Sequence, residues 1–331
     1  MQRLFQRLGY FTTLFALVVI VLGAFVRLSD AGLGCPDWPG CYGQIVVPSS
    51  ESAVLEAQNS YPERALESEK AWKEMAHRYF AATLGFLILA LAVIAWLNRK
   101  DSEQQILLPL FLVGLVIFQA ALGMWTVTLL LKPVIVTLHL LAGMATLGLL
   151  WLMTLRASRK KSIFADRPPS NLKGWAFLAL IILIGQIALG GWTSTNYVAL
   201  HCPDFPTCQG SWLPELDMDE AFTIWRESGV DYEGGVLSLN AGVAVHFMHR
   251  LGAVTTLLVV GLLALRCMLG RYSGVRLLGA TVFLLLMIQV SLGIANVMLR
   301  LPMPIAVSHN GVAALLLMSL LALNFRLSRA S

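Results

Sequence analysis

The sequence predicts an all-α integral membrane protein with eight transmembrane helices, arranged as two four-helix bundles related by a pseudo-twofold axis. Of its 331 residues, 57% are hydrophobic and only 13% are charged, and the mean hydropathy is +0.72. A soluble domain of this size could not bury so much apolar surface. The chain also contains eight apolar runs of membrane-spanning length, and its second half repeats the motifs of the first.

A run of about 20 apolar residues is the length that an α-helix needs to cross a bilayer. The first run lacks a small-residue cleavage site, so we expect a retained helix and not a cleaved signal. In chain order the eight runs lie at residues 10–28, 76–97, 106–127, 134–155, 174–193, 241–265, 276–298 and 304–325.

The charged residues divide between the two sides of the predicted membrane. Of the 24 Lys and Arg residues, 15 lie on the side of the two termini, whereas 16 of the 19 acidic residues lie on the other side or at its edge. The positive-inside rule then places both termini in the cytoplasm. The short basic N-terminus favours a bacterial inner membrane, with the long loops in the periplasm. The net charge of +5 reflects this topology and gives no reason to expect nucleic acid.

The two halves of the chain repeat each other in order and in spacing. Four helices per repeat give both copies the same orientation, with the symmetry axis along the membrane normal. The basic linker at residues 156–173 divides the halves, which we expect to be 1–165 and 166–331. The matching segments are Cys35-Pro-Asp-Trp-Pro-Gly-Cys41 with Cys202-Pro-Asp-Phe-Pro-Thr-Cys208 (offset 167), Gln119, Gly123 and His139 with Gln289, Gly293 and His309 (offset 170), and His77 with His249 (offset 172).

Four histidines enter the apolar runs from the outer side, and they form the pairs His77 with His139 and His249 with His309. An unpaired polar group in an apolar medium costs about 2 to 7 kcal/mol, so each pair predicts a ligand. Heme iron is the leading candidate. A lone histidine would more often bond to backbone or water, but four matched histidines favour ligation. Zinc or copper is a weaker alternative, because no further ligands recur beside the pairs.

Arg78 and Arg250 directly follow the first histidine of each pair. Each arginine could bind heme propionates or extend its guanidinium toward lipid headgroups, and the sequence favours neither. Arg27 is a similar but weaker candidate for a propionate contact.

The repeats differ three residues before the first histidine of each pair, where the N-terminal half has Glu74 and the C-terminal half has His246. The spacing puts each residue on the same helix face as its histidine. A carboxylate beside a heme could act as a base or stabilise a developing positive charge; alternatively, Glu74 is an ordinary acid near a helix N-terminus. We therefore expect the working site in the N-terminal half and a redox relay in the C-terminal half. His246 could contact the second heme or cap its pocket.

The cysteine pairs Cys35 with Cys41 and Cys202 with Cys208 lie in the two long outer loops, where disulfides can form. Each disulfide would pin a Pro-Asp-aromatic-Pro turn over a heme edge. A four-cysteine zinc site and an exchangeable thiol pair in the first loop are alternatives. Cys267 stands alone at the cytoplasmic end of a predicted helix, and we expect it to be inert.

Together, the Glu-x-x-His-Arg segment at Glu74, the four histidines, the fused four-helix repeats and the paired loop cysteines resemble the heme A synthase family along the whole chain. The resemblance implies an oxidoreductase that converts heme O to heme A, by oxidising a porphyrin methyl to a formyl through successive hydroxylations and loss of water. It implies that His77 and His139 hold the substrate heme O, that His249 and His309 hold a heme b cofactor, and that Glu74 is the catalytic carboxylate.

The resemblance also implies a role in cytochrome oxidase assembly, with a heme O synthase as partner and an unidentified electron acceptor or donor. The alternative is a diheme membrane electron-transfer protein, a quinol-linked cytochrome b, which the histidines fit equally well and from which Glu74 distinguishes the synthase. A transporter is disfavoured because the runs are not broken near the bilayer midplane. A prenyltransferase is disfavoured because no Asp-rich diphosphate motif occurs.

Overall fold

The computed structural model describes residues 2–158, 170–270 and 273–329, and nearly all regular structure in these ranges is helical. Eight of the described helices are long and apolar enough to cross a membrane, which confirms the predicted number of spans. The predicted boundary between residues 165 and 166 lies outside the described ranges. The helices are α1 (Gln2–Leu28), α2 (Glu51–Ser60), α3 (Ser68–Leu97), α4 (Leu107–Thr128), α5 (Pro133–Ala157), α6 (Ser170–Thr195), α7 (Met218–Ala221), α8 (Leu239–Leu269), α9 (Ser273–Met298) and α10 (Met303–Ser328).

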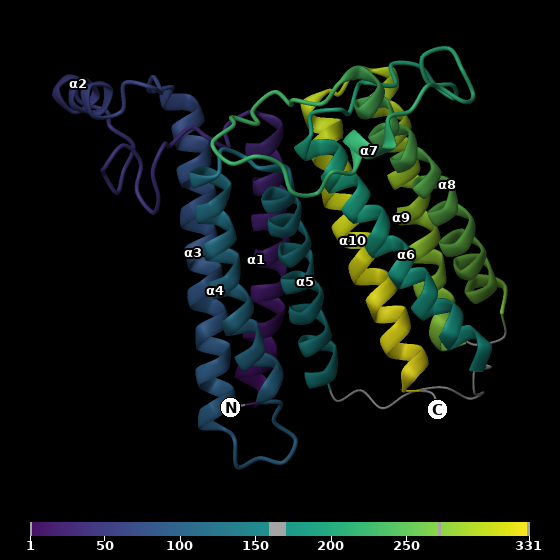
Figure 1. Cartoon of the computed structure of the whole chain (residues 1–331). Coiled ribbons are helices and arrows are strands. Elements are labelled where there is room, and N and C mark those ends of the chain that lie inside the picture. The colour runs from purple at the N-terminus through teal and green to yellow at the C-terminus, as the bar shows by residue number, and fades with distance from the viewer. Residues whose placement is uncertain (1, 159–169, 271–272, 330–331) are drawn as a thin grey trace.

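The spanning helices form two groups of four. The helices α1, α3, α4 and α5 pack on one another, and so do α6, α8, α9 and α10 (Figure 1). The seam between the groups is made by α1 and α5 against α6 and α10. Its core is continuous, because Leu147 of α5 and Leu320 of α10 are both fully buried in one hydrophobic cluster. At the seam, the Trp151 indole donates to the carbonyl of Met318 over 2.9 Å.

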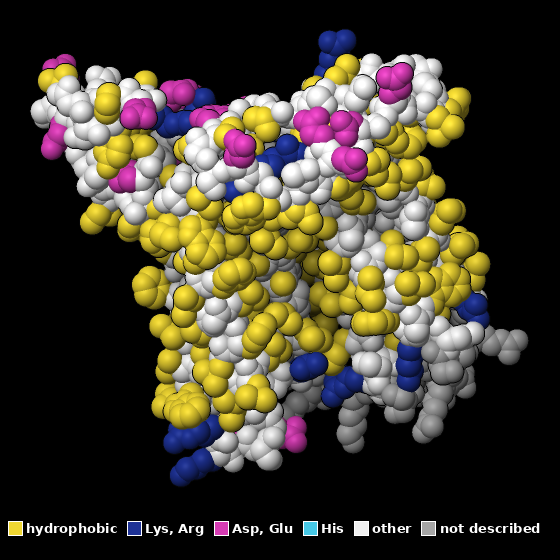
Figure 2. Space-filling model, in the orientation of Figure 1, with side chains coloured by type: hydrophobic (Ala, Val, Ile, Leu, Met, Phe, Trp, Pro, Cys, Tyr) yellow, Lys and Arg dark blue, Asp and Glu magenta, His cyan; other side chains and the backbone are white. Residues whose placement is uncertain are grey.

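The surface has the zones of a membrane protein. A broad hydrophobic surface separates an end where Asp and Glu side chains gather from an end where Lys and Arg predominate (Figure 2). The acidic end carries α2, α7 and the long loops, and the opposite end carries both termini (Figure 1).

The repeat extends to the tight links between helices. In the α4–α5 link, Leu130 and Leu131 have φ angles of 49° and 57°, and in the α9–α10 link Arg300 and Leu301 have φ angles of 59° and 61°. Side-chain-bearing residues rarely adopt this left-handed conformation. Its occurrence at four positions with the same offset of 170 therefore shows that the two halves share a backbone plan, and not only motifs.

One long loop of the C-terminal half reaches over the N-terminal half (Figure 1). The amide of Tyr232 donates to the carbonyl of Leu130 over 3.1 Å. The ammonium of the buried Lys132 bonds to Ser228 over 3.2 Å and lies 3.9 Å from the centre of the Trp225 ring. We call residues 222–238 the strap. It covers the α4–α5 link, close to the helix that carries His139.

Candidate active site

The four predicted ligand histidines lie on four different spanning helices, His77 on α3, His139 on α5, His249 on α8 and His309 on α10. The helix α3 begins at Ser68, ahead of its apolar run, so His77 and Glu74 both belong to regular helix. Each imidazole lies against a glycine of a neighbouring helix, where a Cβ atom would approach the ring carbon Cε1 to 3.6 Å or less. These pairs are His77 with Gly23 (2.9 Å), His139 with Gly123 (3.6 Å), His249 with Gly190 (3.1 Å) and His309 with Gly293 (3.2 Å).

The glycines make room for imidazoles that are incompletely partnered. The Nδ1 atoms of His77, His139 and His309 are buried and have no hydrogen-bond partner. The two histidines of each predicted pair lie close enough for a charge on one to affect the other, His77 with His139 and His249 with His309. A buried polar atom without a partner is costly, so these rings are suited to a ligand.

The four histidines fit a metal that is already coordinated by a cofactor ring. Within the described ranges, no group of three or more His, Cys, Asp or Glu side chains is placed to hold a bare metal ion. A heme iron takes only one or two ligands from the protein, and the two imidazoles of each half would supply them. The residues therefore fit heme better than they fit zinc or copper.

Glu74 is buried and is tied to the first disulfide loop. One carboxylate oxygen, Oε2, accepts a hydrogen bond from the amide of Cys35 over 2.8 Å, and the other pairs with the guanidinium of Arg78. Arg78 also donates to the carbonyl of Asp37 over 3.0 Å and to that of Gly40. The carboxylate is thus held in place three residues from His77, and the loop closes over it.

His246 takes the same place in the C-terminal half. It is buried, and its Nδ1 accepts a hydrogen bond from the amide of Cys202 over 3.3 Å. Its Nε2 lies 3.3 Å from Nε of Arg250. The two terminal nitrogens of the Arg250 guanidinium donate to the carbonyls of Thr207 (2.7 Å) and Cys202 (2.8 Å). His246 therefore anchors the second disulfide loop. Whether it also contacts a heme stays a prediction, as does a propionate contact of either arginine.

Both cysteine pairs are disulfides, Cys35 with Cys41 and Cys202 with Cys208. A four-cysteine zinc site is wrong, because each sulfur is bonded within its own loop. An aspartate organises each ring: Asp37 accepts from the amides of Tyr42 (2.6 Å) and Gly43 (2.9 Å). Asp204 does the same in the other ring, as its place in the repeated Cys-Pro-Asp motif could have indicated. Its carboxylate accepts from Gln209 (2.7 Å), Gly210 (3.0 Å) and the Thr207 hydroxyl.

Arg27 crosses the seam between the two halves. Its guanidinium donates to the carbonyl of Ser194 over 2.5 Å, lies 3.8 Å from the centre of the Tyr197 ring, and is 3.7 Å from the carboxylate of Asp30. These contacts join the outer ends of α1 and α6. A propionate contact of Arg27 remains a prediction.

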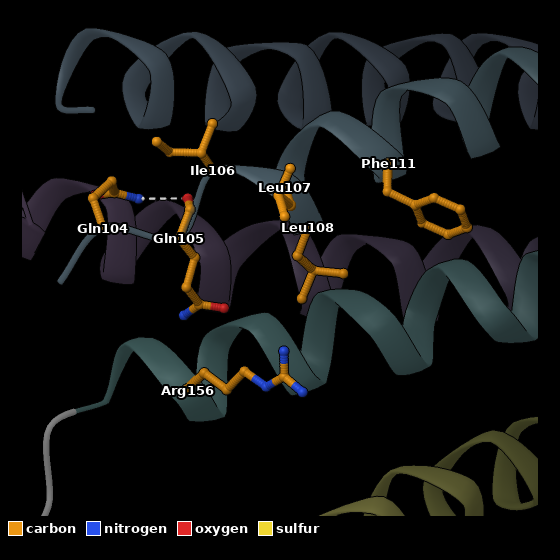
Figure 3. Close-up of a pocket in the computed structure, with 7 residues that line it drawn as sticks. All are labelled: Gln104, Gln105, Ile106, Leu107, Leu108, Phe111 and Arg156. Atoms are coloured by element: carbon orange, nitrogen blue, oxygen red, sulfur yellow. Dashed lines mark hydrogen bonds between the residues drawn. The ribbon is translucent and has the colours of Figure 1, made fainter. Parts of the chain in front are cut away.

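A surface depression lies at the end of the N-terminal bundle away from the histidines (Figure 3). Its lining comes from the α3–α4 link, the start of α4 and the end of α5, whereas His77 lies near the start of α3. It therefore plays no part in the site described above. The lining residues are Gln104, Gln105, Ile106, Leu107, Leu108, Phe111 and Arg156.

Fold and site together define a duplicated, multi-pass membrane protein, in which each half has two histidines packed on glycines and a disulfide loop bonded to Glu74 or His246. Comparison with known proteins gives its family. A family model described as cytochrome oxidase assembly protein (COX15-CtaA) matches residues 6–321. The heme A synthase of Shewanella oneidensis is 46% identical over 314 residues, which cover 95% of this chain and 94% of that protein.

More distant relatives match over nearly the same length. The heme A synthase of Halalkalibacterium halodurans is 25% identical over 99% of both chains. That of Methylobacterium radiotolerans is 26% identical over 97% of this chain and 89% of its own. The chain belongs to the heme A synthase family.

Proposed function

We propose that this protein is a heme A synthase, an oxidoreductase that oxidises the porphyrin methyl of heme O to a formyl group by successive hydroxylations. Its likeness to the Shewanella oneidensis enzyme over 95% of the chain supports this activity. The family's description supports a role in cytochrome oxidase assembly, for which heme A would be the product. The observation that carries the proposal is the buried carboxylate of Glu74 beside one histidine pair, with an imidazole at the equivalent place in the other half.

We assign the substrate to the half that contains Glu74. His77 and His139 would hold heme O, and His249 and His309 would hold a resident heme b. The glycine beside each ring supports ligation by these four imidazoles. The unpartnered Nδ1 atoms of His77, His139 and His309 give further support. The two halves, near 1–165 and 166–331, would then divide substrate chemistry from electron transfer.

The overall reaction sets what the residues must do. Converting a methyl and one water to a formyl group removes four electrons and four protons. A heme b, when bound, would pass electrons to an electron acceptor. Glu74 is placed to accept protons or to stabilise positive charge that develops near the substrate. Arg78 and the Cys35 amide keep its two oxygens in position.

The protein would lie in a bacterial inner membrane with both termini in the cytoplasm. The excess of Lys and Arg at the end that carries the termini supports this orientation (Figure 2). The disulfides at the other end suit the oxidising periplasm. A heme O synthase, itself acting on a membrane-bound heme, would be the natural supplier of substrate.

The test is to express the protein together with a heme O synthase and to identify extracted hemes by pyridine hemochrome spectra and chromatography. Heme A should appear only when both proteins are present. Two bound hemes without any heme A would support instead the diheme electron-transfer protein and overturn the proposal.

A further inference from the structure

Gln186 of α6 holds the ring of His249, and no equivalent residue can do so for His77. The side-chain nitrogen Nε2 of Gln186 lies 3.1 Å from Nδ1 of His249 and 3.1 Å from the backbone carbonyl oxygen of His249. The matching glycines Gly23 and Gly190 align α1 with α6 at an offset of 167. The residue of α1 that corresponds to Gln186 is therefore Val19, which cannot form hydrogen bonds through its side chain.

The space for this glutamine is also particular to the C-terminal half. The amide oxygen of Gln186 packs on Gly252, one turn after His249, where a Cβ atom would overlap with it. At the offset of 172 that relates α3 to α8, the N-terminal half has Phe80, whose ring stacks on Phe15 with centroids 5.6 Å apart. One half thus has a glutamine with a glycine to accommodate it, and the other has valine with an aromatic pair.

The position of the proton on the His249 imidazole explains why the side-chain amide of Gln186 suits the place beside Nδ1. A neutral imidazole that binds a metal through Nε2 carries its proton on Nδ1, and that proton needs an acceptor. The Oε1 atom of Gln186 is buried and has no hydrogen-bond partner. A half-turn of the amide would bring Oε1 to the Nδ1 proton, in exchange for the hydrogen bond from Nε2 to the carbonyl of His249. Gln186 can therefore donate a hydrogen bond to Nδ1 of His249 when no metal is bound, and accept one from Nδ1–H when Nε2 binds a metal.

We infer that Gln186 is a positioning residue of the C-terminal site, which fixes the ring of His249 and accepts a hydrogen bond from its Nδ1–H when Nε2 binds heme iron. The inference rests on the proposed function, which assigns heme b to His249 and His309. A ligand held in this way retains its heme. His77 lacks such a partner, which suits a site that must take up a substrate heme and release the product.

The experiment uses the full-length protein, purified with its hemes, and measures two quantities besides activity. One is the midpoint potential of each heme, and the other is the rate of heme transfer to apomyoglobin. The His249→Ala variant identifies the C-terminal heme as the component that disappears. The test variants are Gln186→Leu, Gln186→Glu and Gly252→Ala, and the matched control is Gln119→Leu, because Gln119 donates only to the backbone carbonyl of His139.

We expect Gln186→Leu to release the C-terminal heme roughly 10- to 100-fold faster, because loss of a partner behind a metal ligand typically lowers the affinity by this factor. Its midpoint potential should rise, because an imidazole without an acceptor donates less charge to ferric iron. Gly252→Ala should act in the same direction by displacing the amide. Gln186→Glu should retain the heme and lower the potential, since a carboxylate is the stronger acceptor. Gln119→Leu should leave this heme unchanged.

The outcomes separate the inference from the proposed function. If His249→Ala removes a heme while Gln186→Leu and Gly252→Ala change neither its potential nor its release, the role of Gln186 is refuted and the proposed function stands. If His249→Ala retains both hemes, the proposed heme site itself is wrong. Should Gln186→Leu fail to fold, Gln186→Glu and Gly252→Ala still decide the matter through the sign of the potential shift.

Discussion

Glu74 and His246 occupy equivalent places in the two halves, and each accepts a hydrogen bond from the backbone amide of the first cysteine of its disulfide loop. The donor atoms match, the neighbouring arginine matches, and only the acceptor differs in chemistry. A carboxylate can carry a full negative charge where an imidazole carries none. The two sites therefore share one framework and differ at the group most suited to proton transfer.

Glu74→Gln should abolish most heme A formation and retain the heme of the C-terminal half. The amide keeps the size of the side chain but cannot accept a proton, and loss of a general base typically costs roughly 10²- to 10⁴-fold in rate. The measurement is the ratio of heme A to heme O in extracts of cells with a heme O synthase. Glu69→Gln is the control, because Glu69 lies on the same helix and pairs with Lys73 at the surface. An unchanged ratio in Glu74→Gln would remove the carboxylate from the mechanism.

Replacing single histidines should empty the two sites separately. We expect His77→Ala to lose the substrate heme and keep the heme b signal, and His249→Ala to do the reverse, because each half supplies its own pair of imidazoles. Optical spectra and heme extraction from the purified variants measure both losses. The control is His201→Ala, since His201 lies in the loop before Cys202 and belongs to neither pair. Loss of both hemes in either variant, with the fold intact, would contradict separate sites.

Removing the two disulfides should have unequal effects on activity. Each closes a ring with a sequence separation of 6, so replacing its cysteines by serine should lower stability by about 2 kcal/mol. Only the double variant Cys35→Ser with Cys41→Ser should also lower heme A formation. Without the disulfide the loop is less constrained, and its amide at residue 35 holds Glu74 less firmly. Thermal unfolding and extracted heme A are the measurements, and the pair Cys202→Ser with Cys208→Ser is the comparison. Full activity without the first disulfide would show that Cys35 and Cys41 have no role in the reaction.

Acid should loosen the second disulfide loop through Asp204. Hydrogen bonds from Thr207 and from the amides of Gln209 and Gly210 lower the pKa of this carboxyl. A carboxyl with a lowered folded-state pKa contributes stability above its unfolded pKa of about 4, and loses it as the pH falls through the folded value. Amide exchange over residues 208–211, corrected for its intrinsic pH dependence, should therefore rise at low pH. At neutral pH the Asp204→Asn variant should exchange faster than the unaltered protein, and this difference should vanish at low pH, where Asp204 is itself neutral. Equal exchange at neutral pH would show that the carboxylate does not organise the turn.

The eight spans, the repeat and the disulfide loops could be predicted because each leaves a local pattern in the sequence. Apolar length gives the spans, and the matched offsets give the repeat. The second apolar run predicts a helix from residue 76, whereas α3 starts at Ser68, well before the apolar residues. The first turns of α3 contain polar residues, so hydropathy alone does not reveal that they are helical.

The remaining site features depend on contacts that no local pattern records. Arg78 and Arg250 bind backbone carbonyls of the loops, and the sequence could not indicate this because it does not give the path of those loops. Gln186 faces His249 from a different helix, and its importance becomes visible only once α6 and α8 are packed together. Gly23 and Gly190 could have been found by extending the offset of 167 into the first helix of each half, but the sequence does not show that they lie against imidazoles.

The strap has a consequence for exchanging halves between relatives. Tyr232, Trp225 and Ser228 come from the second half, yet they lie on Leu130 and Lys132 of the first. A chimera whose second half carries other residues at positions 225 and 228 would leave the buried ammonium of Lys132 without its aromatic and hydroxyl neighbours. Such hybrids should be more stable when residues 129–132 and 222–238 are inherited from the same parent.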